Sequence, residues 1–417
     1  MSLAGLVPLI TADPALAQAI EGAAGGDLTV PQPVTPAVVA GLAQRRPVLA
    51  VTATTREADD LLASLGSLLE PSAVVDFPSW ETLPHERLSP RSDTVGRRLA
   101  ALRRLAHPDP ADPGAGAISV LVAPVRAVLQ PLVVGLGDLE PVTLAVGDEL
   151  DLETVVAQLA DAGYQRVDLV ERRGDFAVRG GILDVFPAVE EHPLRVELWG
   201  DTVEEIRWFK AADQRSLEAA PHGLWAPPVR ELPLTREVRA RAERLAGELP
   251  GLADVLGQLA EGIAVEGMES LSPLLADGMQ LLVDVVPTGT AVVLIDPERV
   301  RARSIELHRT SEEFLAASWA NAAAGNATPI DLGAAAYREL DDVGAAAAAR
   351  SLPWWQVGPF GALDEPAERS VFRPAEEYRG DIDRAMRAVG DAVRDGYRVV
   401  VVTAGHGPAE RFAESLE

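Results

Sequence analysis

The arginines near residue 170 are the first feature of this sequence that could do chemistry. The stretch ERRGDFAVRGGILDVFP spans residues 171–187, and with the residue five positions before it the chain holds four arginines close together: Arg166, Arg172, Arg173 and Arg179. Guanidinium groups bind carboxylates through paired hydrogen bonds. A strand here would place Phe176 and Val178 on one face and Ala177 and Arg179 on the other.

Two interpretations of this arginine cluster stay open on composition alone. Arginine and aromatic side chains dominate protein–protein hot spots, which favours a docking surface for an acidic partner. The alternative is a solvated cluster that offsets the carboxylates nearby, which are Asp168, Glu171, Asp175, Glu190 and Glu191.

A nucleotide site is the next chemistry to consider. A phosphate-binding loop needs glycines before a helix and a lysine that reaches the phosphates. The single lysine, Lys210, lies in RWFKAAD with no glycine loop before it. Asp296 ends the apolar run TAVVLID and could hold Mg²⁺, but Pro297 follows it, so a helix-starting Asp-Pro pair is the favoured interpretation. The sequence therefore predicts no Walker A motif.

Other catalytic and metal-binding patterns are also missing. The six histidines are scattered, cysteine is absent, and no G-x-S-x-G motif occurs, so we expect no catalytic residue and no metal site. The lack of cysteine and of a basic N-terminal signal region favours the cytoplasm, with no membrane partner. A formal net charge of −26 disfavours duplex DNA as a direct partner.

The segment FPSWETLPHERLSPRSDTVGRR, residues 77–98, is the second unusual stretch. One interpretation is single-stranded nucleic acid binding, with Trp80 stacking on a base and arginines on phosphates. The favoured interpretation is a long loop fixed by Trp80, followed by an arginine-rich helix over residues 93–107 with Asp93 or Thr94 as its N-cap.

Alternating strands and helices predict a parallel α/β sheet in the first part of the chain. Strand–helix pairs are expected at 48–69 and 118–130, and a further strand at 73–78. After about residue 136 the pattern changes to a helix at 151–164 and a hairpin at 194–209, which indicates a small α+β domain. A buried strand follows at 290–296, and a strand, turn and helix are expected at 397–417.

Two blocks of sequence carry a resemblance to a known family. RRGDFAVRGGILDVFP with HPLRVELWGDTVEEIRWF resembles the second domain shared by the excision-repair protein UvrB and the transcription-repair coupling factors. FPSWETLPHERLSPRSDTVGRRLAALRRL (77–105) is more similar to the coupling factors, of an actinobacterial type. The resemblance extends from about residue 28 to 345 and is less specific over the last 70 residues.

The resemblance implies a degenerate helicase-like, P-loop-NTPase-like fold. The first domain would comprise 28–136 and 211–345, the inserted second domain 137–210, and a small third α/β domain 346–417. LTVPQPVTPAVVAGL (28–42) would occupy the Walker A position without its glycines and lysine. An inactive nucleotide site would then contain Thr29, Thr35 and Asp296.

The resemblance also implies partners. The second domain would dock UvrA through Arg166 and Arg179, flanked by Arg173, Phe176 and Phe186. Ala177 stands where UvrB often has another arginine. RNA polymerase, DNA, ATP and Mg²⁺ would be handled by later domains of the parent, a DNA translocase, and its C-terminal domains would mask the docking surface at rest.

The function expected from the resemblance is that of a module that recruits UvrA to stalled RNA polymerase in nucleotide excision repair, with no ATPase and no cofactor of its own. The alternative is a UvrB-like, ATP-binding repair helicase subunit that contacts DNA directly.

Overall fold

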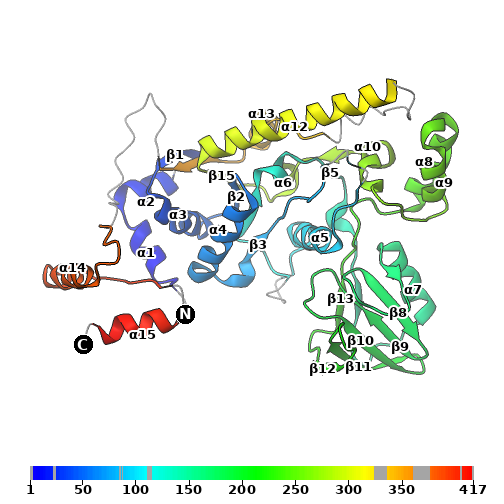
Figure 1. Cartoon of the computed structure of the whole chain (residues 1–417), viewed down its shortest axis with the longest axis horizontal. Coiled ribbons are helices and arrows are strands. Elements are labelled where there is room, and N and C mark those ends of the chain that lie inside the picture. The colour runs from blue at the N-terminus through cyan, green and yellow to red at the C-terminus, as the bar shows by residue number, and fades with distance from the viewer. Residues whose placement is uncertain are drawn as a thin grey trace. The chain divides into compact units, whose positions relative to one another are not determined.

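The computed structural model describes residues 3–21, 25–83, 86, 88–109, 115–323, 336–359, 376–403 and 406–415. The chain divides into two compact units, residues 1–371 and 372–417. The first unit contains a parallel sheet, an inserted mixed sheet and a group of short helices (Figure 1).

Six parallel strands form the first sheet. Their order is β1 (Gly25–Thr29), β16 (Trp354–Gly358), β15 (Ala291–Ile295), β2 (Val48–Thr52), β4 (Val120–Pro124) and β3 (Val74–Asp76). β2 and β4 are buried at every position. Their unbroken apolar sequences are typical of parallel strands that are covered on both faces.

Helices cover both faces of this sheet. On one face, Leu49, Leu121 and Leu294 share a core with α5 (Ser92–Ala106), α6 (Val125–Leu129), α12 (Pro297–Ala323) and α13 (Leu340–Ala349). The alternate strand residues are also buried, and α3 (Thr35–Ala43) and α4 (Thr55–Leu68) contact the same strands. Two N-terminal helices, α1 (Leu6–Thr11) and α2 (Pro14–Glu21), pack near α3. The predicted parallel α/β sheet is confirmed.

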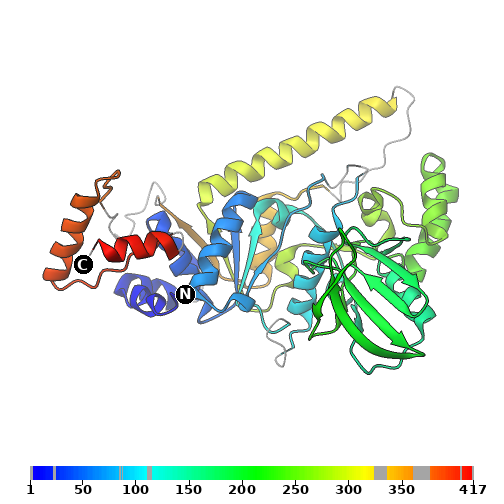
Figure 2. The ribbon, with the colours of Figure 1, turned by 60° about the horizontal axis from the view of Figure 1, so that its bottom comes forward.

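The inserted domain contains a second sheet of six strands (Figure 2). In spatial order these are β12 (Ser216–Ala219), β11 (Thr202–Phe209), β10 (Leu194–Trp199), β9 (Ile182–Val185), β8 (Asp175–Arg179) and β7 (Gln165–Arg166). Helix α7 (Leu152–Asp161) begins at the Asp151 N-cap and buries Val155 and Leu159 in the core of this domain. The predicted helix and the predicted β10–β11 hairpin are both present.

The inserted domain extends past the expected boundary at 210. β13 (Leu224–Ala226) pairs with β6 (Val142–Leu144), so the polypeptide returns to close the domain near residue 227. The buried Tyr164 hydroxyl donates a hydrogen bond to the Pro227 carbonyl at 2.9 Å. Burial raises the pKa of Tyr164 well above its usual range, so this hydroxyl remains a donor.

The boundary expected at 346 also differs. β16 pairs with both β1 and β15 in the middle of the parallel sheet, and the division between the two units falls after residue 371. α13 is the alanine-rich segment, which forms a helix against the main core.

A group of short helices lies between the inserted domain and β15 in the sequence. α8 (Arg236–Glu248) and α9 (Ala253–Ala260) share a separate small core with α10 (Ser272–Leu275). Helix α8 begins after Thr235, whose hydroxyl accepts a hydrogen bond from the Val238 N–H.

Two local predictions are wrong. Helix α5 begins at Ser92, with Arg91 at the N-cap position and no side-chain cap, rather than at Asp93 or Thr94. The strand expected from residue 397 is not formed, and Val400–Val402 are exposed without strand pairing. The described residues of the second unit contain α14 (Ile382–Arg394) and α15 (His406–Glu414) but no other strand to pair with, so an apolar run alone cannot form a sheet there.

Candidate functional site

The arginine-rich stretch forms the β8–β9 hairpin of the inserted domain. β8 ends at Arg179, and β9 begins at Ile182, which lies directly opposite it. Gly180 has φ of +60° in the turn between them, a conformation that glycine adopts without steric cost. The Gly-Gly pair is therefore a turn that ends the strand and presents Arg179 at one end of the sheet.

Two of the predicted contact residues are exposed. Arg166 is exposed in the edge strand β7, and the Arg179 side chain is 54% exposed and forms a long 3.9 Å ion pair with Asp184. Arg173 is half-buried: its guanidinium stacks 5.2 Å above the Phe186 ring, and its Nε donates to the Glu190 carbonyl at 2.9 Å. Arg166 and Arg179 keep most of their hydrogen-bonding capacity for another molecule.

The two predicted aromatic contacts are core residues. Phe176 is only 1% exposed and packs with the main core of the inserted domain. Phe186 packs with Ala177 and Phe209 in a smaller cluster on the opposite face of the sheet. Phe176 on β8 and Phe186, which follows β9, therefore both lie mostly out of solvent, on opposite faces of the sheet.

A ladder of charged side chains crosses the outer face of this sheet, and we did not predict it. Asp184, Arg195 and Arg207 lie opposite one another on successive strands. Arg195 donates from Nε and Nη2 to the buried Asp184 carboxylate at 2.8 and 2.9 Å, which raises the pKa of Arg195. The signal for this ladder in the sequence was the charge at alternate positions of the predicted hairpin: Arg195 and Glu197, then Glu205 and Arg207.

The charged ladder limits how Arg179 can pair with Asp184. The paired hydrogen bonds from Arg195 already occupy both oxygens of Asp184, so Arg179 is a peripheral neighbour of that pair. An exposed guanidinium on a rigid strand end can form paired hydrogen bonds with a carboxylate of another protein at little entropic cost.

The proposed nucleotide residues are gathered at one edge of the parallel sheet. Thr29 ends β1 opposite Gly358 of β16, and Asp296 follows β15 with its N–H bonded to the Val357 carbonyl at 2.8 Å. Thr35 begins α3 and is 5% exposed. Thr29 and Asp296 lie at the same edge because the carboxyl ends of parallel strands meet there. β1, the loop after it and α3 form the strand–loop–helix arrangement expected at 28–42.

The loop before α3 has few groups to offer a phosphate. Pro31 and Pro33 have no N–H. The N–H groups of Val30, Val34 and Thr35 donate to Gly358, Pro31 and Gln32 within the protein. A phosphate cradle needs several free backbone N–H groups that converge on one point.

Trp80 and Arg98, both in the segment at 77–98, are buried. Trp80 is 6% exposed, and its Nε1 donates to Glu231 at 3.0 Å. Arg98 is fully buried and contacts both Glu231 oxygens, and its Nη1 donates to the Pro78 carbonyl at 2.8 Å. Trp80 therefore has no free face for a base, which supports the structural interpretation. Pro84, His85 and Arg87 lie outside the described residues.

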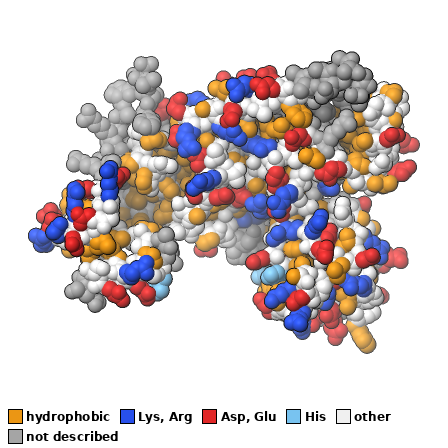
Figure 3. Space-filling model, viewed as in Figure 1, with side chains coloured by type: hydrophobic (Ala, Val, Ile, Leu, Met, Phe, Trp, Pro, Cys, Tyr) orange, Lys and Arg blue, Asp and Glu red, His pale blue; other side chains and the backbone are white. Residues whose placement is uncertain are grey.

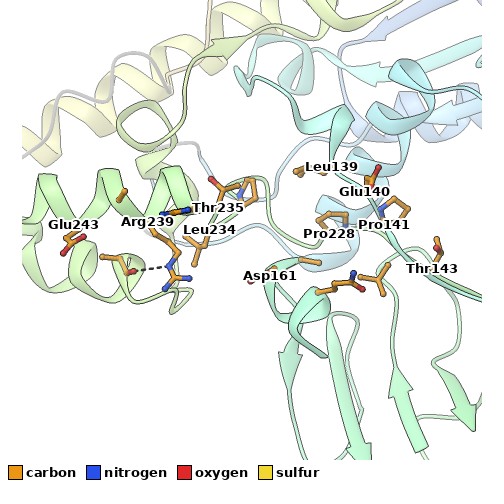
Figure 4. Close-up of a pocket in the computed structure, with 17 residues that line it drawn as sticks. Leu139, Glu140, Pro141, Thr143, Asp161, Pro228, Leu234, Thr235, Arg239 and Glu243 are labelled. Carbon is orange, nitrogen blue, oxygen red and sulfur yellow. Dashed lines mark hydrogen bonds between the residues drawn. The ribbon is translucent and has the colours of Figure 1, made fainter. Parts of the chain in front are cut away.

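An open cleft of about 1010 Å³ separates the inserted domain from α8 (Figure 4). Glu140, Thr143 and Asp161 line one wall, while Arg239 on the other wall donates to the Ala260 carbonyl at 3.1 Å. The lining includes none of the predicted site residues.

The described residues offer no metal site and no membrane-spanning helix. No group of three or more His, Asp or Glu side chains among them is placed to hold a metal ion. No helix in this part of the chain has the length and apolar character needed to cross a membrane. On the face shown in Figure 3, acidic and basic side chains are interspersed over the inserted domain.

Residues 142–227 match the family described as UvrB interaction domain. Over 99% of its length the chain is 48% identical to transcription-repair-coupling factors of Mycobacterium bovis and Mycobacterium tuberculosis. A coupling factor of Myxococcus xanthus is 36% identical over 61% of the chain. The chain spans 35% of the length of the two mycobacterial relatives.

Proposed function

We propose that this chain, which belongs to the transcription-repair-coupling factor family and matches its N-terminal region, is a docking module. The module would bring UvrA to stalled RNA polymerase. The observation that carries the proposal is the exposed Arg179 at the end of a rigid strand. This strand lies inside residues 142–227, the part that matches the UvrB interaction domain.

The docking surface consists of exposed arginines over a well-packed support. Arg166 and Arg179 supply charge, and Arg173, which precedes β8, stacks over Phe186 near the other end of that strand from Arg179. We expect acidic groups on the facing surface of UvrA, because an arginine fork pairs best with a carboxylate. The electrostatic part of this contact would mainly govern association rate and specificity.

We further propose that this chain has no ATPase and needs no cofactor. Support comes from the proline-containing loop before α3, whose N–H groups are largely used within the protein, and from the absence of a lysine there. RNA polymerase, DNA and ATP-driven translocation would involve parts of the coupling factor outside this chain. Those same parts would cover the docking surface at rest.

A calorimetric titration against UvrA tests the docking proposal. We expect wild type to bind and Arg179→Glu to weaken binding by more than about a hundredfold, since charge reversal at an interface arginine costs several kcal/mol. Arg309→Glu is the matched control, because Arg309 is 70% exposed on α12 and far along the chain from the inserted domain. It should bind like wild type.

Two results would contradict this proposal. Equal binding by wild type and Arg179→Glu would show that the arginines are a solvated face. Saturable binding of ATP with Mg²⁺, followed by hydrolysis, would favour the alternative of a UvrB-like helicase subunit.

A further inference from the structure

We propose that the tip of the β10–β11 hairpin extends this docking surface, with Trp199 as an aromatic anchor that enters an apolar pocket of UvrA rimmed by basic groups. This inference rests on the proposed function. It adds a contact that depends on buried apolar area, whereas Arg179 depends on charge.

Trp199 is exposed to an unusual degree. The residue is 79% exposed, and Val146 in the neighbouring loop is 62% exposed. Tryptophan is highly buried on average in folded proteins. A large ring left in water at a surface is costly, and tryptophan is among the residues most enriched at binding hot spots.

The backbone around Trp199 is held in place before any partner binds. Leu150 N–H donates to the Asp201 carbonyl at 2.8 Å, and Gly147 N–H donates to the Val203 carbonyl at 2.9 Å. Val203 N–H donates in return to Asp148. The tip is thus bound to the 145–150 loop, so docking would require little further ordering of the chain.

The tip is continuous with the arginine surface. Leu198 N–H donates to the Gly181 carbonyl at 2.8 Å, directly beside the turn that follows Arg179. Glu197 lies opposite Ile182, and Ile182 lies opposite Arg179. Arg179 and Trp199 therefore lie at the same end of one sheet, and a single partner surface could contact both.

The charges around the tip indicate the chemistry of the facing pocket. Four carboxylate residues near Trp199 are exposed: Asp148, Glu149, Asp201 and Glu204. An aromatic ring with this rim favours arginine or lysine side chains, which can stack on the ring and pair with the acids. UvrA would then present basic groups around a pocket for Trp199 and an acidic group toward Arg179.

Titration of UvrA with Trp199→Ala tests the anchor. We expect binding to weaken about thirtyfold or more, the range of an interface hot spot. Trp199→Phe should retain much of the affinity, because it keeps an aromatic ring. Ile263→Ala is the matched control, since Ile263 is 50% exposed in the helical part of the chain and its truncation should leave binding unchanged.

The possible outcomes separate this inference from the proposed function. If Arg179→Glu loses binding while Trp199→Ala binds like wild type, the anchor is wrong and UvrA docking stands. If wild type fails to bind UvrA, both are wrong. If sedimentation shows a dimer that Trp199→Ala dissociates, the tip contacts a second copy of this chain and the inference is overturned.

Discussion

At the scale of single residues, Arg98 shows how a charge can be used to hold a fold together. Its guanidinium is fully buried, pairs with Glu231 and stacks 4.4 Å above the Phe77 ring. Glu231 also accepts the Trp80 N–H. Buried charges persist only when they are paired and hydrogen-bonded, because desolvation is costly. This cluster joins the 77–98 segment to the polypeptide that leaves the inserted domain.

Breaking this pair should destabilise the protein strongly. Arg98→Met leaves the Glu231 carboxylate buried without its cation, which costs about 3–5 kcal/mol. The measurement is the shift of the urea unfolding transition, followed by tryptophan fluorescence.

A second substitution and a surface control sharpen that measurement. Adding Glu231→Gln to Arg98→Met should recover much of the lost stability, because no buried charge remains and the amide oxygen still accepts from Trp80. Arg309→Met removes an exposed, 3.7 Å ion pair and should change stability by less than about 0.5 kcal/mol. A loss for Arg98→Met no larger than that would show that the buried pair is unimportant.

At the scale of elements, α5 and the inserted domain meet at a point where a side chain would not fit. A Cβ built on Gly96 would lie 2.2 Å from the Ala188 Cβ and 3.4 Å from its Cα. The neighbour is a short side chain next to backbone, so it has little freedom to move aside. The close approach of the two elements therefore requires glycine at 96.

Gly96→Ala should destabilise by about 1–3 kcal/mol, the usual cost of overpacking, even though alanine is the better helix former. Gly66→Ala is the matched control on α4, where nothing lies within 4 Å of the added Cβ. It should stabilise by about 0.5–1 kcal/mol. The measurement for both is the thermal unfolding midpoint.

The contact can also be restored from the other side. Gly96→Ala combined with Ala188→Gly should be more stable than Gly96→Ala alone, since the clash disappears. A double variant that is no better than the single one would place the cost somewhere other than this contact.

At the scale of the whole molecule, the inserted domain has a core of its own. Residues from β6, α7, β8 to β11 and β13 share one cluster, which includes Leu144, Leu159, Leu183 and Leu224. β6 and β13 pair with each other where the polypeptide enters and leaves the domain. This arrangement predicts a unit that folds by itself if both ends are kept.

Two fragments test that prediction. The fragment 140–229 should unfold cooperatively and bind UvrA. The fragment 137–210 lacks β12, β13 and the Pro227 carbonyl that accepts the hydrogen bond from Tyr164. We therefore expect 137–210 to be poorly folded. Circular dichroism during urea unfolding is the measurement. Equal cooperativity in the two fragments would show that the return strand is dispensable.

The sequence by itself determined the elements whose patterns are local. The apolar runs of β2 and β4, the Gly-Asp turn of the β10–β11 hairpin and the Asp151 cap of α7 are all set by neighbouring residues. The exposure of Arg179 follows in the same way, because a strand that ends in Gly-Gly leaves its last side chain at the sheet's end. The resemblance then supplied the interpretation of this surface as a docking site.

Only the tertiary structure decided which residues meet across long separations. Arg98 and Glu231 are 133 positions apart, and no local pattern predicts that they pair. Phe176 on β8 and Phe186 just after β9 are buried because apolar residues from distant segments pack on both faces of the sheet. β16 joined the parallel sheet, and the valines at 400–402 formed no strand, because strand pairing depends on a neighbour that the local sequence does not specify.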